Sequence, residues 1–301
     1  MDLRFQLHLH TTESKGTRVY VESLIEPKQA IDIAKMNNID GIAITDHDKT
    51  TAYDKVKNYA KEKNIILING IEFDTSDGHI IGLNVDTGIE KKIRKGMSAL
   101  EVCDIIKDSS GEVYIPHPFD IRRKGLGKKI KKVDGIIEVF NSLDIFGFED
   151  KYASYVASKL KRPIAAGADA HKPDMINLGI TVVDSEPDEF SVLKSIKKGN
   201  VRFENCRHLT LKDMKELSLD RVISSYEYIK EEIKNGWEVD MKYMKIANCR
   251  FMKPIENFVL DLGVRNRHSR IWDFVTYISY VLTILYGQHN KRDFKEFISK
   301  L

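Results

Sequence analysis

The stretch that decides the fold is FQLHLHT, residues 5–11, close to the N-terminus. Successive side chains of a β-strand point to opposite faces, so His8 and His10 share one face while the leucines beside them take the other. Leucines suit a buried layer, and two imidazoles held at a fixed spacing suit a divalent transition metal. The segment therefore predicts a core strand that carries metal ligands, although an HxH triplet is a short pattern by itself.

Composition limits the class of protein. The 301 residues, 42% of them hydrophobic, fit one large domain with a smaller addition, and the net charge of +3 is only a weak indication of an anionic partner. Cys103, Cys206 and Cys249 lack CxxC spacing, which argues against a disulfide framework or a cysteine zinc site. No leader-like segment opens the sequence, and the apolar stretch 271–286 is short for a membrane span. We expect a cytoplasmic protein.

Strand-like and helix-like patterns alternate as far as about residue 203. After the first strand, strands are predicted at 40–45, 65–70, 78–83, 113–115, 135–139, 163–166 and 180–183. Helices are predicted from residue 27 to Asn37, and at 53–63, 99–109, 150–160 and 189–198. Repeated strand–helix units indicate a parallel sheet, and about seven of them predict closure into a barrel of the TIM type.

Histidines and carboxylates gather where these strands end. In a barrel of this type, the C-terminal ends of the strands meet at one rim, where the chemistry takes place. The side chains in or just after strands are His8, His10, His47, Glu72, His79, His117, Asp169 and His171. Each alone could be a packed core residue or a helix cap, but together they predict a site for several metal ions. His208, His268 and His289 have no such neighbours and are expected to be surface or packing residues.

Five ordered segments resemble the PHP (polymerase and histidinol phosphatase) family of metallophosphoesterases. They are LHLHT (7–11), ITDHD (44–48), GIE (70–72), PHP (116–118) and GADAH (167–171). The resemblance covers about residues 1–185 and implies an α/β fold, a distorted (β/α)7 TIM-like barrel, with two or three divalent metal ions, commonly zinc, manganese or iron. By position it implies a first metal on His8, His10, Glu72 and Asp169, a second on Glu72, His79 and His117, and a third with ligands from His47 and His171.

The sequence departs from the family pattern at the third site. Where relatives carry an Asp or His soon after the HxH motif, this chain reads ESKG, residues 13–16, and a protonated Lys15 cannot be a ligand. Three readings stay open: the centre is binuclear, Glu13 supplies the missing ligand, or Lys15 replaces the third cation. We favour two tightly bound metals with a weak or absent third.

The substrate side has its own signal, a basic loop directly after the PHP tripeptide. Residues 122–132 hold seven basic residues and no acid. Because a guanidinium group binds phosphate through two hydrogen bonds, Arg122 and Arg123 are candidate phosphate ligands, with Lys15 as a third. The alternative is a solvated loop. Asp46, next to His47, is a candidate proton shuttle or a support for that imidazole.

Beyond about residue 205 the alternation stops. Helices are expected at 211–234, 239–249, 271–286 and 293–300, so we predict a barrel domain over 1–203 and a helical C-terminal domain over 204–301. Residues 242–270 combine seven basic and two acidic residues with aromatic ones. Such a surface could bind nucleic acid, but core aromatics under a solvated face are the commoner case. The final apolar helix could pack on the barrel or on a second subunit.

The sequence thus predicts a metal-dependent phosphoric ester hydrolase, either a phosphatase or a phosphodiesterase. The expected substrate is a small phosphomonoester or a nucleotide, and the expected nucleophile is a hydroxide that bridges two metals. One alternative is an exonuclease that uses the basic C-terminal region to guide RNA or DNA. Another, of a different class, is a non-catalytic metal-binding regulatory module, which only Lys15 supports.

Overall fold

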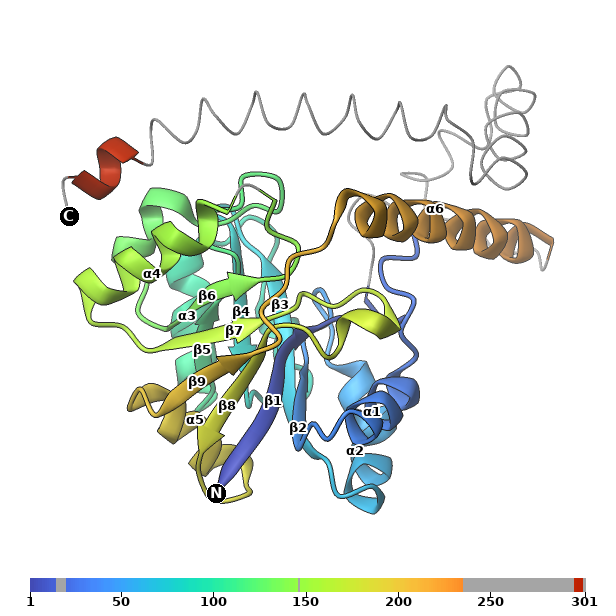
Figure 1. Ribbon diagram of the computed structural model, residues 1–301. Coiled ribbons are helices and arrows are strands. Elements are labelled where there is room, and N and C mark those ends of the chain that lie inside the picture. Colours follow the sequence, from blue (N-terminus) through green and yellow to red (C-terminus); the bar gives the residue numbers. More distant parts are fainter. Residues whose placement is uncertain (15–19, 146, 235–294, 300–301) are drawn as a thin grey trace.

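The structure is a computed structural model that describes residues 1–14, 20–145, 147–234 and 295–299 (Figure 1). Its strands are β1 (Asp2–Leu9), β2 (Gly41–Ile44), β3 (Ile66–Asp74), β4 (His79–Leu83), β5 (Glu112–Ile115), β6 (Ile136–Asn141), β7 (Ile164–Gly167), β8 (Ile180–Asp184) and β9 (Val201–Glu204). Its α-helices are α1 (Pro27–Met36), α2 (Thr51–Glu62), α3 (Ala99–Asp108), α4 (Glu149–Leu160), α5 (Glu189–Lys197) and α6 (Leu211–Lys234). Short 3-10 helices are η1 (Ile89–Lys92), η2 (Gly127–Lys132) and η3 (Pro173–Met175).

The strands form one sheet in the order β7-β6-β5-β4-β3-β2-β1-β8-β9, with the α-helices outside it (Figure 1). The sheet curls until its ends approach each other. Leu9 of β1 forms a parallel bridge with Ala170, which follows β7, and the His10 N–H donates to the Ala170 carbonyl at 2.9 Å. The result is a nearly closed barrel, which confirms the TIM-like fold expected from the sequence.

Two buried polar side chains strengthen the closure beside β7. Gln6 donates through Nε2 to the carbonyls of Ile176 and Leu178, and its Oε1 accepts the Ala168 N–H at 3.0 Å. Thr181 of β8 exchanges hydrogen bonds with the backbone of Ala166. These side chains satisfy buried backbone groups that have no strand partner there, so the seam is held although the ladder is incomplete.

The sheet is mixed, whereas the alternation of elements indicated a parallel one. Strand β4 runs antiparallel to both β3 and β5, and β8 runs antiparallel to β1 and β9. For the β3–β4 pair the reason is the short connection: residues 75–78 form a turn in which Thr75 Oγ1 accepts the N–H groups of Asp77 and Gly78. Four residues suffice for an antiparallel hairpin, but a parallel crossover needs a dozen or more. Strand β9 was not expected from the sequence.

The hairpin decides where two ligand candidates lie. Strand β3 continues through Asp74, so Glu72 lies inside the strand and not beyond its end. His79 begins β4 directly opposite Asp74. Both side chains therefore reach the rim at which β1 ends, although β4 runs in the opposite direction.

The apolar core consists of three clusters of buried side chains. Inside the barrel lie Phe5, Leu7 and Tyr114 with other buried side chains, while two larger apolar clusters separate the sheet from the helices. Local signals set the helix ends: α1 begins with Pro27, and Ser98 and Glu101 form a capping box at the start of α3.

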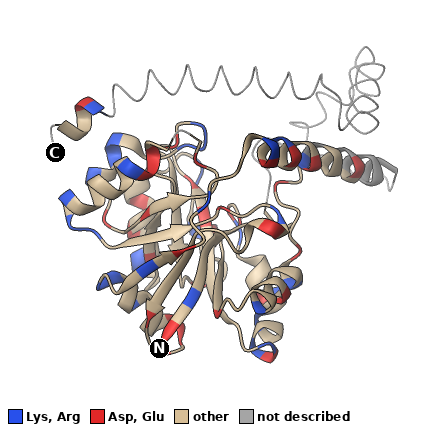
Figure 2. Cartoon of the chain, viewed as in Figure 1, with Lys and Arg blue, Asp and Glu red and all other residues tan. Residues whose placement is uncertain are grey.

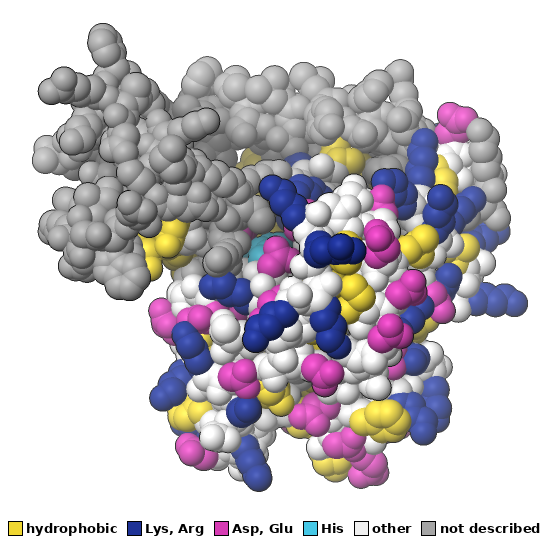
Figure 3. All heavy atoms as spheres, turned by 180° about the vertical axis from the view of Figure 1, so that it is seen from behind, with side chains coloured by type: hydrophobic (Ala, Val, Ile, Leu, Met, Phe, Trp, Pro, Cys, Tyr) yellow, Lys and Arg dark blue, Asp and Glu magenta, His cyan; other side chains and the backbone are white. Residues whose placement is uncertain are grey.

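Helix α6 is present as predicted and lies across the rim (Figure 1). It packs on the barrel through Leu217, which is buried in the cluster that contains Leu9. Lys/Arg and Asp/Glu side chains are intermixed along the described elements (Figure 2). They are also intermixed on the described surface when the molecule is seen from behind (Figure 3).

The helices expected at 239–249 and 271–286 lie outside the described residues, and within 293–300 the structure describes helix at 295–299. The domain boundary near residue 203 stays a prediction. Within the described ranges, no helix combines the length and the apolar character needed to cross a membrane.

Candidate metal centre

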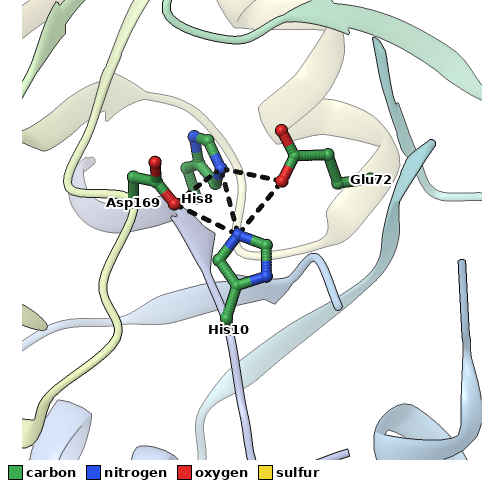
Figure 4. Close-up of side chains that lie close together, drawn as sticks. All are labelled: His8, His10, Glu72 and Asp169. Atoms are coloured by element: carbon green, nitrogen blue, oxygen red, sulfur yellow. Dashed lines mark hydrogen bonds and ion pairs between the residues drawn. The ribbon is translucent and has the colours of Figure 1, made fainter. Parts of the chain in front are cut away.

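Four side chains from three parts of the barrel converge at the rim (Figure 4). His8 and His10 come from β1 and its end, Glu72 from β3, and Asp169 from the segment after β7. The two Nε2 atoms lie 3.1–3.6 Å from Glu72 Oε2 and Asp169 Oδ1, and 3.4 Å from each other. Donors that surround a tetrahedral ion at about 2.1 Å are separated by about 3.4 Å. The four donors therefore already have the spacing of a cation site.

A second group shares Glu72 with the first. Its other oxygen, Oε1, lies 2.9 Å from His79 Nδ1 and 3.3 Å from His117 Nε2, and all three side chains are buried. Glu72 thus presents one oxygen to each group. A carboxylate in this position can bridge two adjacent cations.

The electrostatics of the two groups fit positive ions. Burial alone would raise the pKa of Glu72, but the imidazoles of His79 and His47 hold it well below its usual range. His8 and His171 do the same for Asp169 against the same burial effect. Among the described residues, the buried atoms His79 Nδ1 and Asp169 Oδ1 form no well-aligned hydrogen bond, although each lies within 3.3 Å of another side chain of the site. Such orphaned groups are rare in proteins, and a bound cation would satisfy them.

Glu138 of β6 supports this centre, and the sequence interpretation missed it. Its Oε1 lies 3.0 Å from His8 Nδ1 and accepts the Tyr114 hydroxyl at 2.8 Å. Its Oε2 accepts the His117 N–H at 2.6 Å and the Asn141 amide at 2.8 Å. A carboxylate on Nδ1 places the proton of His8 there and leaves Nε2 free to bind a metal. Glu138 therefore orients ligands of both groups.

The backbone around Glu138 is shaped for this contact. A Cβ atom on Gly167 would lie 2.8 Å from His8 Cβ, so a residue with a side chain would push the strands apart. His117 has φ of +28°, an unfavourable value for a non-glycine residue, and its N–H is the one that Glu138 accepts. The sequence did hold a signal: Glu138 is an acid within the apolar strand IIEVF.

Beside the two groups lies a cavity of about 120 Å³. It is lined by Glu22, His47, Glu72, His79, His117, Arg122, Arg123, Lys124, Leu143, Asp169, His171 and Arg221. Carboxylates and imidazoles form one part of the wall, and cationic side chains form another. The cavity can therefore hold a small anion next to bound cations.

The PHP domain family matches residues 6–248, which is most of the chain. The chain belongs to the PHP domain family. The resemblance carried by its motifs is confirmed, and the class of enzyme with it: this PHP protein is a metal-dependent phosphoesterase.

This PHP chain is also similar to individual proteins. An uncharacterized protein of Methanocaldococcus jannaschii is 32% identical over 145 residues, which are 46% of this chain and 82% of that protein. A 5'-3' exoribonuclease of Haemophilus influenzae is 33% identical over 90 residues, 29% of this chain and 30% of that enzyme. A solved two-domain protein from Bacteroides vulgatus, which contains a predicted PHP-like metal-dependent phosphoesterase, has a TM-score of 0.56 at 15% identity, covering 72% of this chain and 69% of that one. The structural similarity to the Bacteroides vulgatus protein shows a shared fold.

The residues expected at the third PHP metal site are close to the other two groups but do not form a group of their own. The rings of His47 and His171 both stack on His10, with centroids 4.7 and 4.5 Å away. In the described part of the chain, only the first two groups bring three or more donors together. Lys15 lies outside the described residues. Glu13 binds Lys55 at 2.6 Å and Thr51 at 3.2 Å.

The basic loop is engaged within this PHP barrel. The Arg123 guanidinium contacts Asp120, Asp144 and Asp169, so it holds one oxygen of Asp169 while the other faces the histidines. Arg122 donates to Asp120 and to the Leu143 carbonyl, both at 2.7 Å. Both arginines line the cavity. Arg123 is thus tied to three carboxylates, and a phosphate would have to compete with them.

Asp46 faces Thr11. Its Oδ1 accepts the Thr11 N–H at 2.6 Å and its Oδ2 accepts the Thr11 hydroxyl at 2.7 Å. Burial raises the pKa of Asp46 to about 6. Asp46 does not line the cavity. These contacts favour a supporting role over proton transfer.

Glu22 and Arg221 are among the cavity residues that were not singled out in the sequence. Arg221 of α6 donates through Nη2 to Glu22 Oε1 at 2.8 Å, and that oxygen lies 4.0 Å from His171 Nε2. No motif links them, since 199 positions separate the two residues. Only the docking of α6 brings them to the rim.

Proposed function

We propose that this PHP protein hydrolyses the terminal phosphate of a small phosphomonoester or a nucleotide, with two divalent cations held by its two donor groups. The observation that carries the proposal is the placement of Glu72, with Oε2 among the donors of one group and Oε1 among those of the other. Mixed imidazole and carboxylate donors suit zinc, manganese or iron. A third cation is not part of this proposal.

The chemistry is divided between the cations and the chain. When bound, the cations supply Lewis acidity to the phosphoryl group and to the attacking water. Glu138 keeps the Nε2 of His8 directed at the centre, and Arg123 keeps Asp169 in place. Arg122 and Lys124 bring positive charge to the cavity wall, where it offsets the charge of a phosphate group.

The size of the cavity supports the choice of substrate. Sites that enclose a drug-sized ligand have volumes of roughly 300–1,000 Å³, whereas this cavity has about 120 Å³. It can accept a phosphoryl group while the rest of the substrate stays outside. A terminal phosphate can enter such a cavity end-on.

The test combines metal analysis with a substrate panel. Purified protein is analysed for zinc, manganese and iron, and then assayed with phosphomonoesters, cyclic and bis-phosphorylated nucleotides and short RNA. We expect about two metal ions per chain and hydrolysis of monoesters. His117→Ala should lose one metal and most turnover. His208→Ala is the matched control, because His208 binds Asp150 and does not line the cavity. Retained hydrolysis in His117→Ala would remove the second group from the mechanism.

An exonuclease is the second candidate. The similarity to the Haemophilus influenzae exoribonuclease favours it, as does the basic segment 242–270 of the sequence. Binding of single-stranded RNA or DNA that weakens steeply with salt would support this candidate, since phosphate contacts release counterions. A non-catalytic metal-binding module is disfavoured by the two complete donor groups. Bound metal without turnover of any ester in the panel would revive it.

A further inference from the structure

Helix α6 is fixed to the rim next to the metal centre. The Val21 N–H donates to Ser225 Oγ at 2.8 Å, and the rings of Tyr20 and Tyr228 stack with centroids 4.8 Å apart. Asp220 of the helix also pairs with Lys172, one residue after His171, at 3.4 Å. Figure 1 shows α6 beside the segment that leads into α1. Several independent contacts thus hold this helix where its side chains can reach the cavity.

Arg221 is the cavity residue that α6 supplies. An arginine has five N–H donors. Among the described residues, Glu22 is the hydrogen-bonded partner of Arg221, through Nη2 alone. The Nε of Arg221 is buried and has no partner in this part of the chain. Leaving a buried donor unsatisfied is costly, so this guanidinium has capacity for an anion.

The cationic residues of the cavity differ in how many of their charges and donors are paired with carboxylates. Arg123 is surrounded by three carboxylates, and Lys124 binds both oxygens of Asp74 at 2.6–2.8 Å. Within the described ranges, Arg221 has one carboxylate partner. It also lies on the His171 side of the centre, whereas Asp74, the partner of Lys124, lies 4.0 Å from His79. Arg221 is thus less neutralised than Arg123 and Lys124, and it stands apart from the loop cations.

We propose that Arg221 is a substrate-binding residue, whose guanidinium donates to the phosphate oxygens of the ester in the cavity while Glu22 positions it. Helix α6 then completes the active site, so the barrel alone is not the whole enzyme. This inference rests on the proposed function, because it assigns a phosphate ligand to the same cavity. It also makes a claim about anion binding that can be measured without turnover.

The experiment compares Arg221→Ala with the unchanged chain, both in full length. Inorganic phosphate is the probe: we expect it to raise the melting temperature of the unchanged protein and to have little effect on Arg221→Ala. With a hydrolysed monoester, kcat/KM should fall about 10- to 100-fold, mainly through KM, as for loss of a charge-assisted hydrogen bond. Arg221→Lys should keep part of both properties, since it retains the charge but not the fork. The metal content should not change.

Asp220→Asn is the matched control. It removes the ion pair one residue away on the same helix without touching the cavity lining, so it reports what looser docking of α6 does by itself. Equal losses in Asp220→Asn and Arg221→Ala would overturn the inference, and so would a phosphate response that persists in Arg221→Ala. If the unchanged protein hydrolyses no ester but its phosphate response disappears in Arg221→Ala, the proposed function fails while Arg221 stands as an anion ligand.

Discussion

The two sides of the metal centre are built differently. On one side, strands β1, β3 and β6 bring His8, Glu72 and Glu138 together, and the supporting hydrogen bonds come from the barrel interior. On the other side, the segment before α1 and helix α6 supply Glu22 and Arg221. Strand positions hold side chains within narrow limits, while loops and added helices can vary without loss of the barrel. Under the proposed function, the strands set the metal chemistry and the added elements select the substrate.

The same contrast appears in how the imidazoles are held. On the strand side, Glu138 lies 3.0 Å from the Nδ1 of His8, and Ser14 Oγ lies 3.3 Å from that of His10. On the other side, His171 donates from Nδ1 to the carbonyl of Asp169 at 2.7 Å, and its Nε2 points toward Glu22. Substitutions on the strand side should therefore weaken metal binding more than substitutions on the other side.

Removal of metal should have the largest effect. A chelator is expected to abolish hydrolysis, because both donor groups act through bound cations, and added zinc, manganese or iron should restore it. Ligands at about 100 times their Kd stabilise a protein by about 2.7 kcal/mol, so the melting temperature should fall by about 5–10 °C. Calorimetry measures the melting temperature, and an assay of the same sample measures the rate of hydrolysis. If turnover did not fall after the loss of metal had been verified, the donor groups would not act through bound cations.

Glu72→Gln should be the most damaging single substitution. It removes a negative charge from both groups at once, and we expect turnover to fall about 10³-fold or more, beyond the loss of one electrostatic donor. Metal analysis should show fewer than two ions per chain. Asp74→Asn is the control, since Asp74 lies two residues along the same strand and binds Lys124. If the two variants behaved alike, Glu72 would not be a shared ligand.

Much of the strand side could be predicted from the sequence, because its signals are local. The HxH spacing on an apolar strand placed His8 and His10, and the motif pattern placed Glu72 and Asp169. Two further features had signals that were passed over. Glu138 interrupts an apolar strand, and the turn at 75–78 is too short for a parallel crossover.

The other side could not be predicted in the same way. Arg221 reaches the cavity only because α6 docks on the segment around Val21, and a helical pattern does not tell where a helix packs. The commitment of Arg123 to three carboxylates also depends on tertiary structure, since Asp144 and Asp169 are 21 and 46 positions away. The sequence shows the basic residues of a loop but not their carboxylate partners, so it predicts phosphate ligands where the structure has ion pairs.

Glu138→Gln should have an intermediate effect. The amide can still accept hydrogen bonds through its oxygen, but it loses the charge that holds the proton of His8 on Nδ1. Partners of metal ligands typically contribute 10- to 100-fold in metal affinity or activity, and we expect a loss of that size. Metal titration of the purified variant measures it. Tyr114→Phe, which removes one hydrogen bond to the same carboxylate, should lose less. A Glu138→Gln protein with unchanged metal affinity would show that the barrel fixes His8 by packing alone.

Asp46→Asn should have the smallest effect, although Asp46 adjoins a site histidine. Both oxygens of Asp46 accept hydrogen bonds from Thr11, so this pair joins the loop after β1 to the end of β2. Asparagine can accept the Thr11 N–H through its oxygen while the Thr11 hydroxyl rotates to accept from the amide. We therefore expect kcat to fall less than about tenfold, whereas loss of a proton-transfer group typically costs 10²- to 10⁴-fold. The pH profile of kcat decides between them: a loss of the larger size together with a missing limb would make Asp46 a proton shuttle. An unaltered profile would place it among the residues that hold the loop.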